Sequence, residues 1–118
     1  MKEETGKRSE IKGVSVGGKG IAEGPAVFIS VKADYSKDVA GKILVSDSFS
    51  PSLTLLYKNA KGVVSKTGGQ LAHSAIIARE MGLPAIVQVQ NFEMITEGQM
   101  LRINGATCKI IPVDKRTY

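Results

Sequence analysis

The residues best suited to chemistry lie in one stretch, TGGQLAHSAIIAREMGLPAIV, which runs from Thr67 to Val87. It contains a glycine pair, Gly68 and Gly69, then a short turn, and then His73, the only histidine of the chain. Glycine adopts backbone angles that other residues avoid and carries no side chain, so amide N–H groups beside it can point at a bound anion. The glycine pair therefore predicts a phosphate-binding turn just before a histidine.

His73 stands where a helix is predicted to begin. The N-terminus of a helix has unpaired N–H groups and a partial positive charge, which together favour a bound anion. The same charge favours the neutral imidazole, which is the nucleophile that phosphoryl transfer requires. Transfer through N-phosphohistidine divides one difficult exchange into two in-line displacements. From the residues alone two interpretations of His73 stay open: a catalytic phosphoryl acceptor, or a residue that only caps or packs the helix.

Arg79, Glu80 and Cys108 are the other residues considered for chemistry. Arg79 lies in the second half of the predicted helix, where it is either a phosphate ligand or the partner of Glu80 in an ion pair that locks the helix against the sheet. Cys108, the only cysteine, precedes the apolar run KII and is predicted to be a buried thiol in a strand. One histidine and one cysteine are too few nitrogen and sulfur ligands for a structural zinc site, so we predict no metal site.

Strands are expected to carry this motif, because apolar runs rich in β-branched residues recur along the chain. We expect strands at residues 11–16, 26–32, 42–46, 63–65 and 85–90. The glycine-rich segment 17–25, GGKGIAEGP, is expected to form a long turn without a regular element. The pair Asn104-Gly105, between two β-type runs of residues 100–113, predicts a terminal hairpin or a close variant of one.

Two helices are predicted. The first has Ser50 as its cap and Pro51 as its first residue, and it ends at Lys61 and Gly62. The second covers AHSAIIAREMG, residues 72–82, and ends at a glycine that is followed by a proline two positions later. Their apolar side chains are expected in the core, namely Leu53, Leu56, Ile76 and Ile77.

This order of elements, mostly strands with about two helices, is typical of an α/β or α+β domain in which helices cover one side of the strands. The length of 118 residues, 42% of them apolar and 23% charged, fits one compact domain with one core. We predict a disordered arm or linker at residues 1–10, the folded domain at 11–113 and a tail at 114–118.

The charge pattern limits the partners. Lys and Arg (16) exceed Asp and Glu (11), and the excess lies largely near the two ends of the chain. Because there is no Trp and the other aromatic residues are scattered, we predict no nucleic-acid partner. No apolar run approaches the roughly 20 residues that span a bilayer. The single cysteine fits a reducing compartment, so we predict a cytoplasmic protein without a membrane partner.

The block TGGQLAHSAIIAREMGLPAIV resembles the active-site signature of the phosphoenolpyruvate-utilising enzymes, in their mobile, swivelling phosphohistidine domain. This family includes phosphoenolpyruvate synthase, pyruvate phosphate dikinase and rifampicin phosphotransferase. The resemblance extends to IKGVSVGGKGIAEGPAVFI near the start, to KILVSDSFSPSLTLLYKNAKGVV before the motif and to ITEGQMLRINGATCKIIPV at the end. It therefore covers residues 11–113.

The resemblance implies a swivelling β/β/α fold, with helices packed on one side of the strands and a phosphohistidine at a helix N-terminus. It implies that His73 accepts the phosphate and that Gly68 and Gly69 bind it, and Arg79 matches a family arginine. Leu71 stands where the family commonly has Thr, Ser or Asn. The rifampicin phosphotransferase branch is similar at this place, so Leu71 argues against regulation through a threonine.

On this resemblance we expect a phosphoryl-carrier domain of a phosphotransferase similar to phosphoenolpyruvate synthase. It would shuttle phosphate between an ATP site and a phosphoenolpyruvate, pyruvate or other acceptor site. No cofactor is expected on the domain itself. ATP and Mg are expected on partner domains, an ATP-grasp domain and an acceptor domain, in the same chain or in separate ones. The alternative is a non-catalytic interaction or regulatory module that keeps the swivelling fold.

Overall fold

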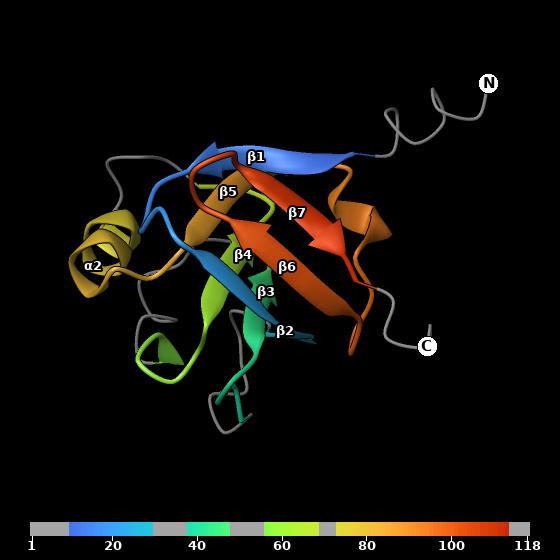
Figure 1. The fold of residues 1–118 in the computed structure, drawn as a ribbon, viewed down its shortest axis with the longest axis horizontal. Helices are drawn as coiled ribbons and strands as arrows, with labels where there is room; N and C mark the ends of the chain where they lie inside the picture. The colour runs from blue at the N-terminus through green and yellow to red at the C-terminus, as the bar shows by residue number, and fades with distance from the viewer. Residues whose placement is uncertain (1–9, 30–37, 48–55, 69–72, 114–118) are drawn as a thin grey trace.

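The strands that the structure describes form one closed barrel (Figure 1), in the order β1-β5-β4-β3-β2-β6-β7. This arrangement comes from a computed structural model, which describes residues 10–29, 38–47, 56–68 and 73–113. The described residues also contain one α-helix, α2 (His73–Met81), and a short 3₁₀ helix, η2 (Phe92–Met94). The strands are β1 (Ile11–Ser15), β2 (Ile21–Phe28), β3 (Ile43–Ser46), β4 (Gly62–Ser65), β5 (Ala85–Gln90), β6 (Met100–Asn104) and β7 (Lys109–Pro112).

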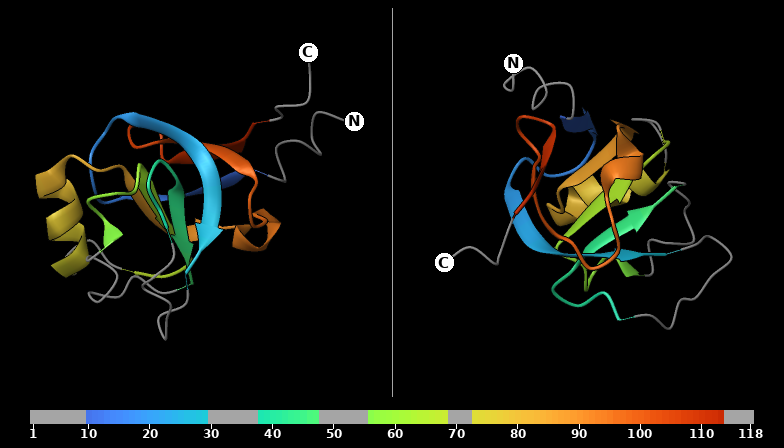
Figure 2. Two further views of the ribbon diagram at one scale, coloured as in Figure 1. Left: turned by 90° about the horizontal axis from the view of Figure 1, so that it is seen from below. Right: turned by 90° about the vertical axis from the view of Figure 1, so that its right-hand side faces the viewer.

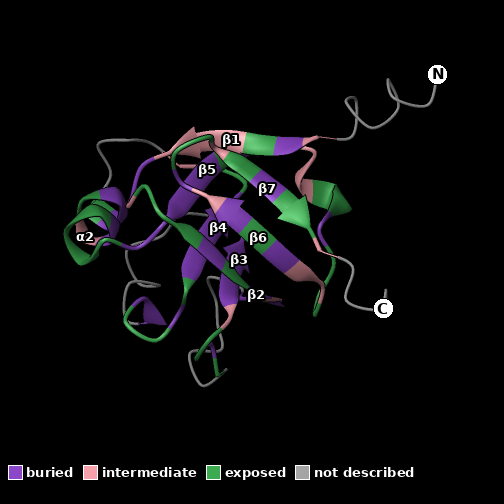
Figure 3. Ribbon diagram, viewed as in Figure 1, coloured by how far each residue is buried: buried purple, intermediate pink, exposed green. Residues whose placement is uncertain are grey.

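The barrel has a parallel half and an antiparallel half. Strands β2, β3, β4 and β5 pair in parallel, and the remaining pairs are antiparallel. β3 and β4 are buried along their whole length, as expected of parallel strands that are covered on both faces. In β6 the middle residues alternate between buried and exposed, as expected of a strand with one face in solvent (Figure 3).

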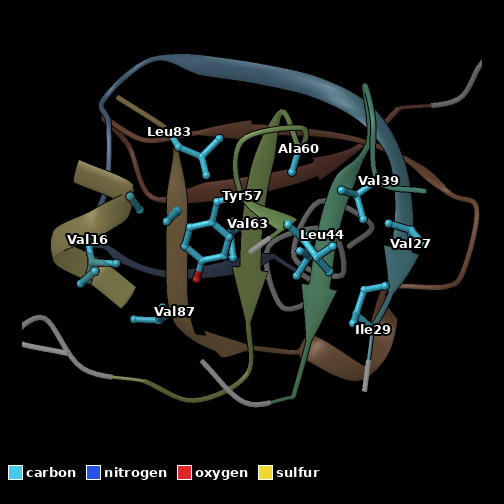
Figure 4. Close-up of a cluster of buried hydrophobic side chains, with 14 residues drawn as sticks. Val16, Val27, Ile29, Val39, Leu44, Tyr57, Ala60, Val63, Leu83 and Val87 are labelled. Atoms are coloured by element: carbon cyan, nitrogen blue, oxygen red, sulfur yellow. The ribbon is translucent and has the colours of Figure 1, made fainter. Parts of the chain in front are cut away.

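Alternate residues of the parallel strands enter two apolar clusters. Ile43 and Val64 belong to an inner cluster that receives side chains from every strand, so this cluster fills the barrel. Leu44 and Val63 belong to an outer cluster, drawn in Figure 4, that also contains residues of α2. The period of two along each strand therefore separates the barrel interior from the layer beneath the helix.

Helix α2 connects β4 to β5 and lies at one end of the barrel, over the parallel half (Figures 1 and 2). Its buried residues are small: Ser74, Ala75 and Ala78 are all 0% exposed. Gly82 follows the helix with a φ of 69°, the left-handed conformation that ends helices. The helix predicted at 72–82 and the strands predicted at 42–46, 63–65 and 85–90 are thus confirmed to within one or two residues.

The prediction that residues 17–25 hold no regular element is wrong, because β2 begins at Ile21. This part of β2 pairs with β6, from Ile21 opposite Asn104 to Pro25 opposite Met100. Pairing with a distant strand therefore overrides the weak strand propensity of glycine and proline. The strand predicted at 26–32 ends at Phe28, and residues 30–32 lie outside the described residues.

The first predicted helix is not a regular helix where the structure describes it. Residues 51–55, with Leu53, lie outside the described part of the chain, and residues 56–60 form tight turns. In these turns the amide N–H of Asn59 donates to the carbonyl oxygen of Leu56 at 3.2 Å. Leu56 is 8% exposed, so its predicted place in the core is confirmed. No helix among the described residues is long and apolar enough to cross a membrane.

Two single-residue predictions are also wrong. Ile76 is 42% exposed, because the buried face of α2 is centred on small residues and leaves the larger side chain in solvent; Ile77 packs partly against the core as predicted. Cys108 lies in the loop between β6 and β7, with a φ of 66°, and not in a strand. The hairpin predicted at Asn104-Gly105 is confirmed as a longer variant, in which the Asn104 side chain accepts hydrogen bonds from the following loop amides.

Candidate functional site

His73 is the first residue of α2, and its side chain is exposed. The next residue, Ser74, is fully buried, so the start of the helix is anchored while the imidazole lies in solvent. A phosphoryl carrier must bring its nucleophile to a donor on another domain. The exposure of His73 meets that condition, which a histidine sealed in the core could not meet.

Gly68 lies between the end of β4 and the start of α2, with a φ of 138°. This value falls in the region that favours glycine, so the first glycine of the pair adopts the unusual backbone predicted for it. The phosphate-binding role of Gly68 stays a prediction. Gly69 and Leu71 belong to segment 69–72, which lies outside the described residues.

Side-chain hydrogen bonds hold the backbone around Gly68. Ser65 Oγ donates to the carbonyl oxygen of Thr67 at 2.7 Å, and Thr67 Oγ1 donates to the carbonyl oxygen of Asp47 at 3.1 Å. Gln88 Nε2 donates to the carbonyl oxygen of Gly68 at 2.7 Å. Because N–H and C=O point in opposite directions across a trans peptide, the bond to the Thr67 carbonyl turns the amide N–H of Gly68 away from Ser65.

Sequence reasoning missed Ser65 and Gln88 as parts of the site. Each is a polar residue in or at the end of an otherwise apolar strand, and that interruption was the available signal. Their hydrogen-bond partners could not be predicted, because Gln88 is 20 residues from Gly68 along the chain. The contact arises because β5 pairs directly with β4.

Tyr57 and Ser74 tie the first turn of α2 to the core. The Tyr57 side chain is 1% exposed and stands in the middle of the outer cluster (Figure 4). Burial raises the pKa of Tyr57 from 10.0 to about 12, and the Ser74 side chain offsets part of this rise. Since Ser74 directly follows His73, these two buried side chains lie next to the candidate nucleophile. Sequence analysis did not single out Tyr57 or Ser74.

Arg79 lies in the last turn of α2 and is exposed. It follows His73 by six residues, which corresponds to about 9 Å of helix rise, so the structure does not bring the two backbones together. Its role as a phosphate ligand and its ion pair with Glu80 both stay predictions. Among the described residues, no group of three or more His, Cys, Asp and Glu side chains could hold a metal ion.

The sequence is similar to those of known proteins. The sequence matches the family model described as "PEP-utilising enzyme, mobile domain" over residues 39–108. The chain is 33% identical over 116 residues to the uncharacterized phosphotransferase YvkC of Bacillus subtilis (strain 168), covering 98% of this chain and 14% of that protein. It is 42% identical over 87 residues to rifampicin phosphotransferase of the same organism, covering 73% of this chain and 10% of the relative.

A solved structure supports the fold. The solution structure of Enzyme I (nEIt) superimposes with a TM-score of 0.59 at 24% identity, covering 72% of this chain and 36% of that one. The chain spans 10% to 14% of the length of the two curated relatives. The family match runs from before β3 to the loop between β6 and β7 and includes His73, so this chain belongs to the family of the mobile domain of PEP-utilising enzymes.

Proposed function

We propose that this domain carries a phosphoryl group on His73 between a site that uses ATP and a second site, where pyruvate is converted to or from phosphoenolpyruvate or another small substrate accepts the phosphate. One observation supports the choice of residue above all others. His73 is exposed at the first residue of α2, after the glycine turn and within the segment that matches the family. A reachable imidazole at a helix N-terminus is where a phosphate dianion is best accommodated.

The proposed reaction consists of two displacements at phosphorus. In the first, a ring nitrogen of His73 attacks the donor phosphorus; a P–N bond forms while the P–O bond to the leaving group breaks, and the leaving group keeps the electron pair. In the second, an acceptor oxygen attacks the phosphohistidine; a P–O bond forms, and the P–N electron pair returns to the ring. A hydroxyl acceptor loses its proton to a base on the acceptor domain or to solvent.

The domain's own residues would bind and orient the phosphate. The first turn of α2, which begins at His73, offers N–H groups that have no partner within the helix. The N–H of Gly68, turned away from Ser65, offers a further donor, and we propose the same role for Gly69. We propose that Arg79 contributes positive charge from the last turn of the helix.

The domain is proposed to swivel as it works. β1 begins and β7 ends next to each other, with Ile11 opposite Ile110, and both ends lie away from α2 in Figure 1. Linkers joined at these ends would leave α2 free to face two different sites. We propose an ATP-grasp domain and an acceptor domain as those partners, in the same chain or in separate ones. ATP and Mg would bind there and not on this domain, and the location would be cytoplasmic.

Intact mass spectrometry tests this proposal. The chain is incubated with an ATP-grasp donor domain and ATP, with phosphoenolpyruvate and an acceptor domain, or with phosphoramidate, a small donor that needs no partner. We expect one added phosphoryl group that is lost in acid and kept in alkali. His73→Ala should abolish it, and Glu80→Ala, an exposed change on the same helix, should not. Label that persists in His73→Ala contradicts the proposal, and no label with any donor favours the non-catalytic module.

A further inference from the structure

Gln88, in β5, has a backbone conformation that residues other than glycine seldom adopt. Its φ is 53°, within the left-handed region. It does not sit in a turn, because it lies inside the strand between two buried valines. Unfavourable backbone angles persist only where the surroundings compensate for them, and they cluster at functional sites. We therefore looked for contacts around Gln88 that compensate for its conformation.

The strand geometry at Gln88 is that of a β-bulge. The register between β1 and β5 shifts between Lys12 and Val14, so Gly13 alone faces two residues of β5, Gln88 and the one after it. Gly13 fits the bulge closely, since an added Cβ there would lie 2.3 Å from the carbonyl oxygen of Val87. Bulges redirect side chains and are frequent next to active sites. A glycine at position 88 would form this bulge without an unfavourable φ, yet the chain has a glutamine.

The glutamine side chain has a specific partner. Its Nε2 donates to the carbonyl oxygen of Gly68 at 2.7 Å, across the pairing of β5 with β4. Because the peptide unit is planar, holding this carbonyl sets the plane of the peptide through which the chain leaves Gly68 toward His73. The carbonyl of the preceding residue is held by Ser65. Donors from two neighbouring strands thus hold two successive peptide units just before the histidine segment.

We propose that Gln88 is a positioning residue for phosphoryl transfer. The φ of Gln88 is unfavourable at the bulge, and its carboxamide holds the Gly68 peptide in the orientation needed before His73. This inference rests on the proposed function, since it assigns Gln88 a part in the same site. It does not require Gln88 to touch the phosphate.

A role in positioning and a role in stability predict different results for three variants. Gln88→Gly removes the carboxamide and relieves the positive φ. Gln88→Glu keeps the shape of the side chain but replaces the donor by an oxygen that repels the Gly68 carbonyl. Gln90→Gly is the matched control, because Gln90 is an exposed glutamine in the same strand, has no positive φ and pairs with Lys12.

Two measurements are made on the full chain: the unfolding midpoint in urea, and the rate at which phosphoramidate phosphorylates His73, followed by intact mass. Gln88→Gly and Gln88→Glu should each slow phosphorylation about tenfold, the equivalent of one hydrogen bond of modest strength. The midpoint of Gln88→Gly should equal or exceed that of the unsubstituted chain. Gln90→Gly should give the opposite pattern, a lower midpoint and an unchanged rate.

The outcomes distinguish the role of Gln88 from the carrier function of the domain. If the unsubstituted chain is phosphorylated on His73 and both Gln88 variants react as fast as Gln90→Gly, the role of Gln88 is wrong while the carrier function stands. If the rate and the midpoint of Gln88→Gly fall together, the residue is structural and the inference is overturned. If the unsubstituted chain accepts no phosphate from any donor, the carrier function fails, and the role of Gln88 fails with it.

Discussion

Replacing Tyr57 by phenylalanine removes one buried oxygen and leaves the ring in place. Tyr57 and Ser74 are 1% and 0% exposed, and the Ser74 hydroxyl offsets part of the rise that burial causes in the pKa of Tyr57. Ser74 Oγ makes no hydrogen bond among the described residues, so Tyr57→Phe breaks no such bond of the serine. We therefore expect the free energy of unfolding at pH 7 to change by less than about 1 kcal/mol, the net value of one hydrogen bond.

Alkaline pH gives a second measure of the same hydroxyl. Because burial raises the pKa of Tyr57 from 10.0 to about 12, the folded chain keeps a proton that the unfolded chain loses. The stability that the neutral phenol contributes is present in full below pH 10.0 and disappears as the pH rises through about 12. Each pKa unit corresponds to about 1.4 kcal/mol, so the unsubstituted chain should lose about 1.4 kcal/mol through this group by about pH 11.

The Phe variant has no phenol at this position, so the stability of the unsubstituted chain relative to the Phe variant should fall by that amount between about pH 9 and pH 11. Urea unfolding followed by far-ultraviolet circular dichroism measures both chains across this range, and the titration of lysines cancels in the difference. A difference that stays constant would refute the burial of the Tyr57 hydroxyl. A loss of about 2 kcal/mol or more in the Phe variant at pH 7 would refute the inference that Ser74 loses no hydrogen bond.

Two other changes test the bulge and the helix. Gly13→Ala should lower the free energy of unfolding by about 2 kcal/mol or more, because the added Cβ would lie 2.3 Å from the Val87 carbonyl oxygen. Gly20→Ala, with nothing within 4 Å of its Cβ, is the control in the same urea titration. Arg79→Ala should slow phosphorylation of His73 by phosphoramidate about threefold, and added salt should reduce the effect because the charge acts from the far end of α2. An equal rate at low salt would remove Arg79 from the site.

Local sequence patterns predicted the elements whose burial follows a simple period. Residues 42–46 and 85–90 are apolar runs, and each forms a strand of the parallel half. The start of β2 was missed because its residues, IAEGP, are weak strand formers that pair with β6, far along the chain. Gly24 even requires a small residue, since a Cβ there would lie 2.6 Å from the carbonyl oxygen of Gly41. Local propensity contains no information about such a distant partner.

For helix α2, local patterns predicted the backbone but not which side chains are buried. Its existence and both ends could be predicted from helix formers, a following glycine and a proline. Its buried face could not, because hydrophobicity favours burying Ile76, whereas the barrel accepts Ala75 and Ala78 at 0% exposure. Close approach of the helix to the strands leaves room for methyl groups only, and packing at native density then excludes the larger side chain.

Some residues of the candidate site could likewise be predicted from a local motif, and others could not. His73 and Gly68 could be predicted because a short motif contains them both, together with the helix start that makes their chemistry plausible. Ser65, Gln88 and Tyr57 could not be assigned from the sequence, because each acts through a partner that the fold brings near. Ser65 and Gln88 hold carbonyls before the histidine, and Tyr57 is buried beside Ser74, the residue after it.

The residues that support the site lie on more than one strand, and this predicts how transfer should change when one of them is lost. Hydrogen bonds from β4 and β5 fix the chain before segment 69–72, and the burial of Ser74 fixes it after His73, while His73 itself stays exposed. A carrier needs both properties, because its nucleophile must be reachable by two partner domains and yet present the same geometry to each. Loss of one of these supports should therefore change the rate of transfer by the same factor for any donor. A change that affected only one donor would instead place the residue in the contact with that partner.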